Sequence, residues 1–120
     1  MANILVVDDS ASMRQMVSVT LKDAGHIITA ADNGSAALDI AKRQKFDLVL
    51  TDVNMPVMDG ITLTREIRKL GQYRFTPILI LTTEAGGDKK QEGKAAGATG
   101  WLVKPFNPSQ LLATISKVVA

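Results

Sequence analysis

The sequence contains no cysteine, which excludes disulfide bonds and thiolate metal sites. This absence agrees with the reducing conditions of the cytoplasm, where we expect the protein. No apolar run approaches the roughly 20 residues of a bilayer-spanning helix, so no membrane association is expected. The apolar residues 4–7 follow Met1 without a basic segment before them or a small-residue cleavage site after them. They indicate a first strand and not a signal peptide.

The sequence also lacks a strong charge of one sign. Its formal net charge of +2 is too small to indicate nucleic-acid binding by itself. The basic residues are scattered, and those at Lys42, Arg43 and Lys45 are expected to form a solvated face. The 120 residues fit one domain, residues 1–120, which buries roughly two-thirds of the surface of its unfolded chain.

Five short runs rich in Ile, Leu and Val predict the strands of a sheet. They are almost continuously apolar, as expected of parallel strands that are covered on both faces. The runs are residues 4–7, 27–31, 48–51, 78–81 and 100–103.

Helical patterns with apolar residues at three-four spacing lie between these runs. Ser10 is a predicted cap of the first helix, and Asn107-Pro108 begins the last. The segment 86–97 is the weakest predicted helix, because each interior glycine costs about 1 kcal/mol relative to alanine. We expect it to be short and comparatively mobile. The apolar positions of the other helices are Met13, Met16, Val17, Thr20, Leu21 and Ala24, then Ala37, Ile40 and Ala41, then Leu63, Ile67 and Leu70, and finally Leu111, Leu112, Ile115, Val118 and Val119.

The alternation of strands and helices predicts a doubly wound α/β domain, with a parallel sheet and right-handed crossovers. In such folds ligands bind beyond the carboxyl ends of the strands. Four of the five runs end in polar residues, whereas the second ends in Ala30-Ala31. The polar ends are Asp8-Asp9-Ser10, Thr51-Asp52, Thr82-Thr83-Glu84 and Lys104-Pro105.

These strand ends would bring carboxylates, a hydroxyl group and an ammonium group to one edge of the sheet. Any one of these polar residues is also common at the solvent-exposed end of a strand, but their occurrence at four strand ends favours a functional site. Clustered carboxylates repel one another unless they share a cation. Oxygen ligands select a hard ion, and Mg²⁺ suits a site with few protein ligands and several waters. A metal over a carboxylate, beside a lysine and a hydroxyl group, is typical of phosphoryl transfer.

The paired acids Asp8-Asp9, the segment 52–60, Thr82 and Lys104-Pro105 together resemble the signature of response-regulator receiver domains. Each motif is weak alone, but their order and spacing make a specific signal over essentially the whole chain. The segments 81–84 and 97–106 are most similar to stand-alone chemotaxis receivers of the CheY type. The resemblance implies a flavodoxin-like (βα)5 fold with strand order 2-1-3-4-5.

The resemblance implies that Asp52 is the nucleophile and phosphoacceptor. Mg²⁺ would be bound by Asp9, by Asp52 and by the backbone carbonyl of Asn54, with Asp8 acting largely through water. The protein would promote only its own phosphorylation and dephosphorylation, and would not be an enzyme in the ordinary sense.

Other roles also follow from the resemblance. Thr82 would donate a hydrogen bond to one phosphoryl oxygen, and Lys104 would pair with another. The Lys104-Pro105 bond is expected to be cis, a form open to X-Pro bonds at modest cost. The side chains of Asn54 and Glu84 stand where the family tunes hydrolysis of the aspartyl phosphate.

The resemblance also implies a histidine kinase as the phosphodonor. The only histidine, His26, falls between the first helix and the second strand, at the end of the sheet opposite the carboxylates. The phosphohistidine must therefore come from another protein, and His26 is expected to be a solvated loop residue. A flagellar motor switch protein or a phosphatase are candidate partners of this expected monomer, and the roles of phosphate sink and relay intermediate stay open.

Trp101 stands where the family more usually has Tyr or Phe, three positions before the lysine. It is interpreted either as a side chain that moves inward on activation or as a fixed interface anchor. Lys89, Lys90 and Lys94 of the glycine-rich helix form either a solvated basic face or a docking surface for an acidic partner.

Two other protein classes use related features. Haloacid-dehalogenase-type phosphatases form an aspartyl phosphate, but their nucleophile usually lies on the first strand in an Asp-x-Asp motif, and 120 residues leave little room for a substrate pocket. Flavin-binding modules of the same topology need a hydroxyl- and glycine-rich phosphate loop after the first strand. Here Asp8-Asp9 would repel the cofactor phosphate.

Overall fold

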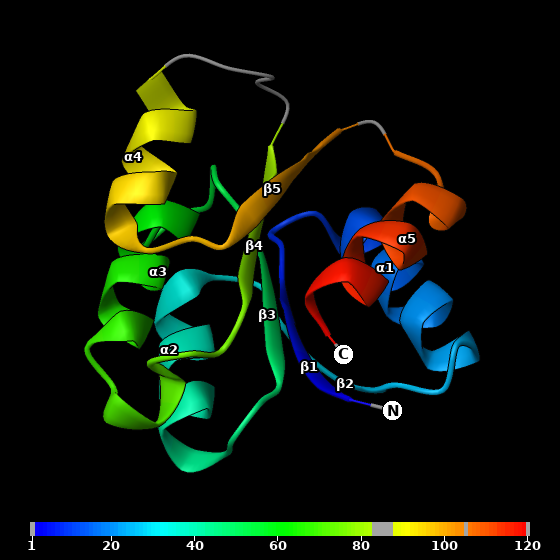
Figure 1. Ribbon diagram of the computed structural model, residues 1–120, viewed down its shortest axis with the longest axis horizontal. Coiled ribbons are helices and arrows are strands. Elements are labelled where there is room, and N and C mark those ends of the chain that lie inside the picture. Colours follow the sequence, from blue (N-terminus) through cyan, green and yellow to red (C-terminus); the bar gives the residue numbers. More distant parts are fainter. Residues whose placement is uncertain (1, 83–87, 105, 120) are drawn as a thin grey trace.

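The strands of this computed structural model form one five-stranded parallel sheet of order β2-β1-β3-β4-β5 (Figure 1). The structure describes residues 2–82, 88–104 and 106–119, without the side chains of residues 88–90. The predicted fold class and strand order are confirmed. The strands are β1 (Asn3–Val7), β2 (Ile27–Ala31), β3 (Leu48–Asp52), β4 (Ile78–Thr82) and β5 (Gly100–Val103).

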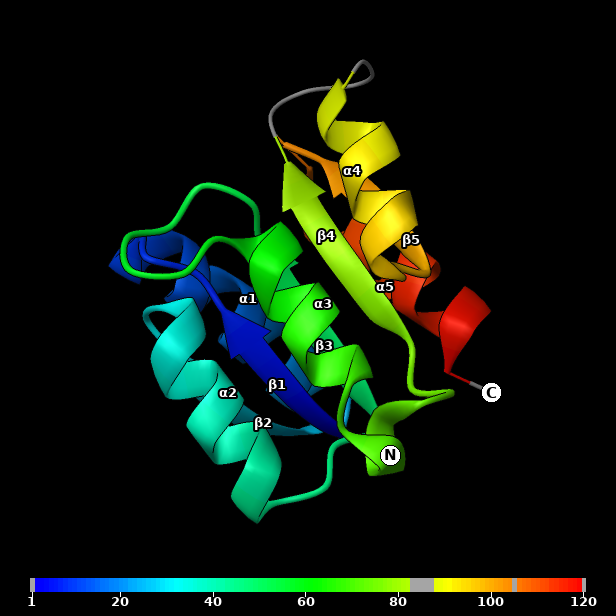
Figure 2. The same ribbon diagram turned by 90° about the vertical axis from the view of Figure 1, so that its left-hand side faces the viewer.

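Helices cover both faces of the sheet, α1 and α5 on one side and α2, α3 and α4 on the other (Figure 1). Figure 2 shows the face that carries α2, α3 and α4. None of the helices in the described part of the chain is long and apolar enough to cross a membrane. The helices are α1 (Ala11–Asp23), α2 (Gly34–Arg43), α3 (Gly60–Arg68), α4 (Asp88–Ala96) and α5 (Pro108–Val118), with a short 3₁₀ helix η1 (Gly71–Tyr73) after α3.

Two apolar clusters, one on each face, form most of the core. Successive side chains of a strand point to opposite faces. In β1, accordingly, Leu5 and Val7 pack toward α2 and α3, whereas Ile4 and Val6 pack toward α1 and α5. This two-sided burial explains the continuous apolar runs of the inner strands. The edge strand β2 differs, because Ile27 is 52% exposed.

The predicted helix starts are confirmed. The Ser10 hydroxyl accepts a hydrogen bond from the Met13 amide at 3.3 Å, and Asn107 forms a reciprocal capping box with Gln110 before α5. Leu70 was predicted in the third helix but lies beyond the end of α3, because the chain turns there into η1.

Helix α4 forms in spite of its glycines, and at nine residues it is as short as α3. Among its described side chains only Gly93 and Ala96 are buried. A Cβ atom at Gly93 would lie 2.9 Å from Ile80 Cδ1, so glycine allows the helix to approach the sheet closely. The predicted mobility of this helix stays a prediction.

Candidate phosphoacceptor and metal site

The last residue of β3, Asp52, lies at the middle of the carboxyl edge of the sheet, because β3 runs between β1 and β4. Its side chain is largely buried. Its Oδ1 accepts hydrogen bonds from the Val53 amide at 2.9 Å and from the Lys104 ammonium at 3.1 Å. Oδ2 receives no hydrogen bond from the residues that the structure describes. One carboxylate oxygen is therefore held in place and the other remains available.

Two further carboxylates follow β1. Asp8 is buried, and its oxygens accept from the Ser10 amide at 2.9 Å and from Lys104 Nζ at 3.3 Å. Asp9, the next residue, is exposed. One carboxylate oxygen each from Asp8, Asp9 and Asp52 lies within 4.8 Å of the others. The structure thus brings together acids from two neighbouring strands.

Lys104 reaches this cluster from the far side of β4. Its backbone amide donates to the Thr82 carbonyl at 2.7 Å, which extends the pairing of β5 with β4 by one residue. From there the side chain, 14% exposed, ends between Asp8 and Asp52. The ammonium group therefore partly neutralises the acids.

Burial dominates the electrostatics of Asp52. Loss of solvent raises the pKa of this carboxyl group above its ordinary value, and the hydrogen bond and charge of Lys104 only partly offset the rise. The negative charge of Asp8 raises the pKa further. A second cation at the cluster would favour the ionised form that a nucleophile needs.

Gly60 allows α3 to begin directly against the strand that ends in Asp52. A Cβ atom at this position would lie 2.0 Å from the Asp52 carbonyl oxygen and 2.9 Å from its carbon, so any side chain would displace backbone. Asp59 caps the helix by accepting from the Thr62 amide at 2.7 Å. This Asp-Gly pair belongs to the family segment 52–60, but its steric role depends on the close approach of α3 to β3, which no sequence pattern predicts.

The remaining predicted site residues lie at or near the same edge. Thr82 ends β4 and is largely buried, next to the strand that carries Asp52. Asn54 is exposed in the loop after β3. Trp101 lies on β5 and is half-buried. It packs against a small apolar cluster formed by Val53, Ile61, Ile80 and Ala96. The roles assigned to these residues stay predictions.

Most of the predicted residues on and next to α4 lie outside the part of the chain that the structure describes. Lys94 is exposed near the end of α4, whereas the side chains of Lys89 and Lys90 lie outside the described residues. The same holds for Glu84 and for the Lys104-Pro105 bond.

His26 lies at the opposite end of the sheet, as its place in the sequence predicts. Its Nδ1 accepts a hydrogen bond from the Ala2 amide at 3.1 Å, next to the first residues of β1 and β2. His26 is a loop residue, as expected, but it is half-buried and not fully solvated, because it bonds to the chain just before β1.

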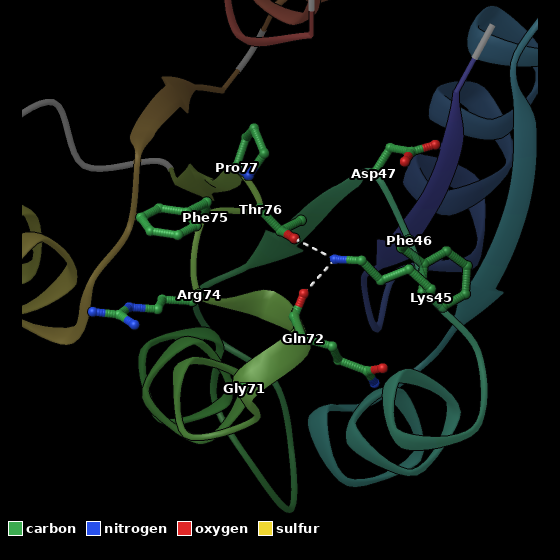
Figure 3. A pocket seen from close by; sticks show the side chains of 9 residues that line it. All are labelled: Lys45, Phe46, Asp47, Gly71, Gln72, Arg74, Phe75, Thr76 and Pro77. Carbon is green, nitrogen blue, oxygen red and sulfur yellow. Dashed lines mark hydrogen bonds between the residues drawn. The ribbon is translucent and has the colours of Figure 1, made fainter.

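Lys42, Arg43 and Lys45 are exposed, as expected of a solvated basic face, but Lys45 also makes specific contacts. Its ammonium group donates to the Gln72 carbonyl and to the Thr76 hydroxyl, and it lies 4.6 Å from the centre of the Tyr73 ring. These bonds cross a surface hollow (Figure 3). Phe75 also lines the hollow, and its ring points away from Lys45. Lys45 therefore joins the loop before β3 to the loop before β4.

The acid cluster fits a small hard cation. Two oxygens on opposite sides of an octahedral Mg²⁺ are about 4.2 Å apart. The oxygens of Asp8, Asp9 and Asp52 already lie within 4.8 Å of one another, and exposed Asp9 is free to adjust. The donor set is oxygen only, which suits Mg²⁺ or Ca²⁺ and not a soft metal.

Comparisons with known proteins agree with this geometry. The response regulator receiver domain family matches residues 4–116. The solved chemotaxis response regulator CheY4 of Vibrio cholerae has 58% sequence identity and a TM-score of 0.95, with 98% of each chain covered. The chemotaxis protein CheY of Pseudomonas aeruginosa is 40% identical over 116 residues, 96% of this chain and 94% of that protein.

A third relative bears on the metal. The receiver domain of sensor histidine kinase PA1611 from Pseudomonas aeruginosa was solved with a magnesium ion coordinated in its active-site cleft. It has 31% identity and a TM-score of 0.92, covering 98% of this chain and 97% of that one.

A five-stranded parallel sheet of this order, with an acid cluster and a lysine at its carboxyl edge, defines a flavodoxin-like signalling fold. The chain belongs to the response regulator receiver domain family. Its likeness to CheY proteins supports a response regulator of the chemotaxis type.

Proposed function

We propose that this chain is a single receiver domain, residues 1–120, that accepts a phosphoryl group on Asp52 in a Mg²⁺-dependent reaction. The observation that supports this most is the bridge from Lys104 Nζ to the carboxylates of Asp8 and Asp52, at 3.3 and 3.1 Å. It places a fixed positive charge beside the proposed nucleophile, where transferred phosphoryl oxygens need neutralisation.

In the proposed transfer, Asp52 Oδ2 attacks the phosphorus of a phosphohistidine. The new O–P bond forms as the P–N bond breaks, and the electron pair of that bond returns to the imidazole nitrogen. The nitrogen takes up a proton from water. Asp52 Oδ1 stays bonded to the Val53 amide, which keeps the carboxylate in one orientation during the reaction.

Asp9, Asp52 and the backbone carbonyl of Asn54 are the proposed Mg²⁺ ligands, with Asp8 acting through water. When bound, the ion would neutralise charge on the equatorial phosphoryl oxygens. Lys104 would turn from the carboxylates to a phosphoryl oxygen, and the hydroxyl of Thr82 would donate to another. The magnesium ion in the receiver domain of PA1611 supports this assignment.

The proposed donor is a phosphohistidine of a separate histidine kinase in the cytoplasm. His26 accepts a hydrogen bond from Ala2 next to the start of β2, whereas Asp52 ends β3 at the opposite edge of the sheet. The chain therefore has no histidine that reaches its own phosphoacceptor. Proteins related to CheY support a kinase of a chemotaxis-type pathway.

The proposed output is a phosphorylation-dependent change of the surface formed by α4, β5 and α5. Phosphorylation adds roughly two negative charges beside β4. Trp101 and the lysines Lys89, Lys90 and Lys94 would report that change to a partner, such as a flagellar motor switch protein or a phosphatase. A phosphate sink and a relay intermediate are the alternative outputs.

The test is incubation with a small-molecule phosphodonor and Mg²⁺, followed by intact-mass measurement and Trp101 fluorescence. We expect one phosphoryl group on the wild type, none on Asp52→Asn, and normal labelling of Asp39→Asn, an exposed carboxylate on α2. Equal labelling of the wild type and Asp52→Asn would remove Asp52 from its role. Sustained turnover of a small phosphate ester would instead favour a haloacid-dehalogenase-type phosphatase.

A further inference from the structure

Asp9 is the one member of the acid cluster that no hydrogen bond from residues 2–82, 88–104 and 106–119 positions. Asp8 accepts from Ser10 and Lys104, and Asp52 accepts from Val53 and Lys104. The exposed carboxylate of Asp9 has no such partner among the residues that the structure describes. Its place in the cluster therefore depends on the backbone that carries it.

Arg14 holds that backbone. Its Nη1 donates a hydrogen bond of 2.7 Å to the carbonyl oxygen of Asp8, which belongs to the peptide unit that joins Asp8 to Asp9. Arg14 lies in the first turn of α1, where its own amide donates to the Ser10 carbonyl at 2.9 Å. A hydrogen bond from a charged donor is shorter and stronger than a neutral one, so this bond fixes the orientation of the peptide unit.

Arg14 is the only arginine in the described part of the chain whose guanidinium contacts the loop that follows β1. Its charge points to a backbone carbonyl and not to a carboxylate. An arginine that merely neutralised the acids would be expected to form an ion pair with one of them.

We propose that Arg14 is a positioning residue for the Mg²⁺ site, which orients the Asp8–Asp9 peptide so that the Asp9 carboxylate faces that of Asp52. This inference rests on the metal binding in the proposed function. It adds a residue from α1 to a site that otherwise consists of strand ends.

Positioning and simple charge repulsion predict opposite effects on Mg²⁺ affinity. Removing a positive charge beside an acid cluster raises the affinity for a second cation. Removing a hydrogen bond that orients a metal ligand lowers it, typically by tenfold or more. A neutral substitution at Arg14 therefore distinguishes the two roles by the direction of the change.

The experiment is an NMR titration with MgCl₂ of the wild type, Arg14→Met, Arg14→Lys and the control Arg43→Met. We expect Arg14→Met to bind Mg²⁺ about tenfold more weakly than the wild type. Arg14→Lys keeps the charge and one donor, and is expected to lose less. The Nε of Arg43 donates to the Asp39 carbonyl on α2 at 3.3 Å. The control Arg43→Met therefore removes an arginine–carbonyl bond away from the site, and it is expected to leave the Mg²⁺ affinity unchanged.

The rate of labelling by a small-molecule phosphodonor gives a second readout. At saturating Mg²⁺ the rate of Arg14→Met is expected to return to within about twofold of the wild type, because the substitution acts through metal binding. If Arg14→Met fails to fold, the Mg²⁺ titration of Arg14→Lys tests the inference in its place, and weaker binding than in the wild type is expected.

Unchanged or tighter Mg²⁺ binding by the Arg14 variants would overturn the inference and leave the proposed function standing. Absence of Mg²⁺ binding by the wild type would instead overturn the proposed function itself. An equal loss of affinity in Arg43→Met would also overturn the inference, because the effect would then not depend on the loop after β1.

Discussion

Lys104 Nζ lies 3.1 Å from Asp52 Oδ1 across 52 positions of sequence, and the same ammonium group reaches Asp8 Oδ2 at 3.3 Å. In the absence of a metal, this lysine is the cation that the acids share. A Mg²⁺ ion at this cluster would therefore compete with Lys104 for the negative charge of Asp8 and Asp52.

Replacing Lys104 by Met leaves the two carboxylates without their cation. We expect a loss of about 2 kcal/mol of unfolding free energy without metal, and Mg²⁺ affinity about tenfold tighter than that of the wild type. Mg²⁺ is expected to raise the melting temperature of the wild type, and of Lys104→Met by more. Thermal melts over a MgCl₂ series measure both effects.

Lys69→Met is the matched control for Lys104→Met. Its ion pair with Glu66 at 2.9 Å is exposed to solvent, so its loss is expected to change stability little. If MgCl₂ raises the melting temperature of Lys104→Met by no more than that of Lys69→Met, Lys104 does not compete with the metal.

The raised pKa of Asp52 predicts how stability changes with pH. The unfolded state loses this proton near the ordinary value of 3.8, and the native state loses it at a higher pH. Between these two values the native state binds more protons, so the contribution of Asp52 to stability falls as pH rises and stays low above the native pKa. Asp52→Asn is therefore expected to be more stable than the wild type at pH 7 without metal.

Urea denaturation from pH 3 to pH 8 tests this sign, and the gap between the two proteins is expected to close below about pH 4. Glu66→Gln is the control, because Lys69 lowers the pKa of Glu66 and its contribution is lost as pH falls. A gap for Asp52→Asn that widens toward acid pH would contradict the assignment.

Gly60→Ala tests the close approach of α3 to Asp52. The added Cβ would lie 2.0 Å from the Asp52 carbonyl oxygen, so the start of α3 must shift, at a cost of about 3 kcal/mol. Phosphoryl incorporation is expected to slow as well, because the shift displaces the Asp52 backbone. Chemical denaturation and intact-mass kinetics measure the two effects.

Gly71→Ala is the control, since nothing lies within 4 Å of a Cβ atom at that position. It is expected to be neutral or slightly stabilising. Equal stability losses in the two alanine variants would argue against steric contact as the cause.

Val57 has a positive φ of 72°, at the centre of a tight turn in which the Met58 amide donates to the Pro56 carbonyl at 2.8 Å. A β-branched residue rarely adopts this conformation, whereas Asn does so more readily. Val57 is also 84% exposed, so its side chain contributes little packing. Val57→Asn is expected to raise the unfolding free energy by about 1 kcal/mol, or the melting temperature by about 4 °C.

Val19→Asn makes the same substitution at an exposed position in α1, where the two residues have similar helix propensity. It is expected to change stability by less than about 0.5 kcal/mol. Differential scanning calorimetry compares the two variants, and destabilisation by Val57→Asn would show that the turn is not strained.

The sequence alone was sufficient for the fold class and for the edge of the sheet that carries the site. Buried parallel strands require uninterrupted apolar runs, and β1, β3 and β4 have them. Parallel strands also place all their carboxyl ends together, so Asp8, Asp52 and Lys104 were expected at one edge without any knowledge of the register. The strand order itself came from the family resemblance.

Only the tertiary structure decided which side chains contact which. The Arg14 bond to the Asp8 carbonyl, the bridging position of Lys104 and the hydrogen bonds of Lys45 depend on distances between separate elements. Periodicity along the chain describes which face of an element is apolar, but it holds no information on where a long basic side chain ends. Those endpoints follow from how helices pack on the sheet, and that packing sets the electrostatics of the site.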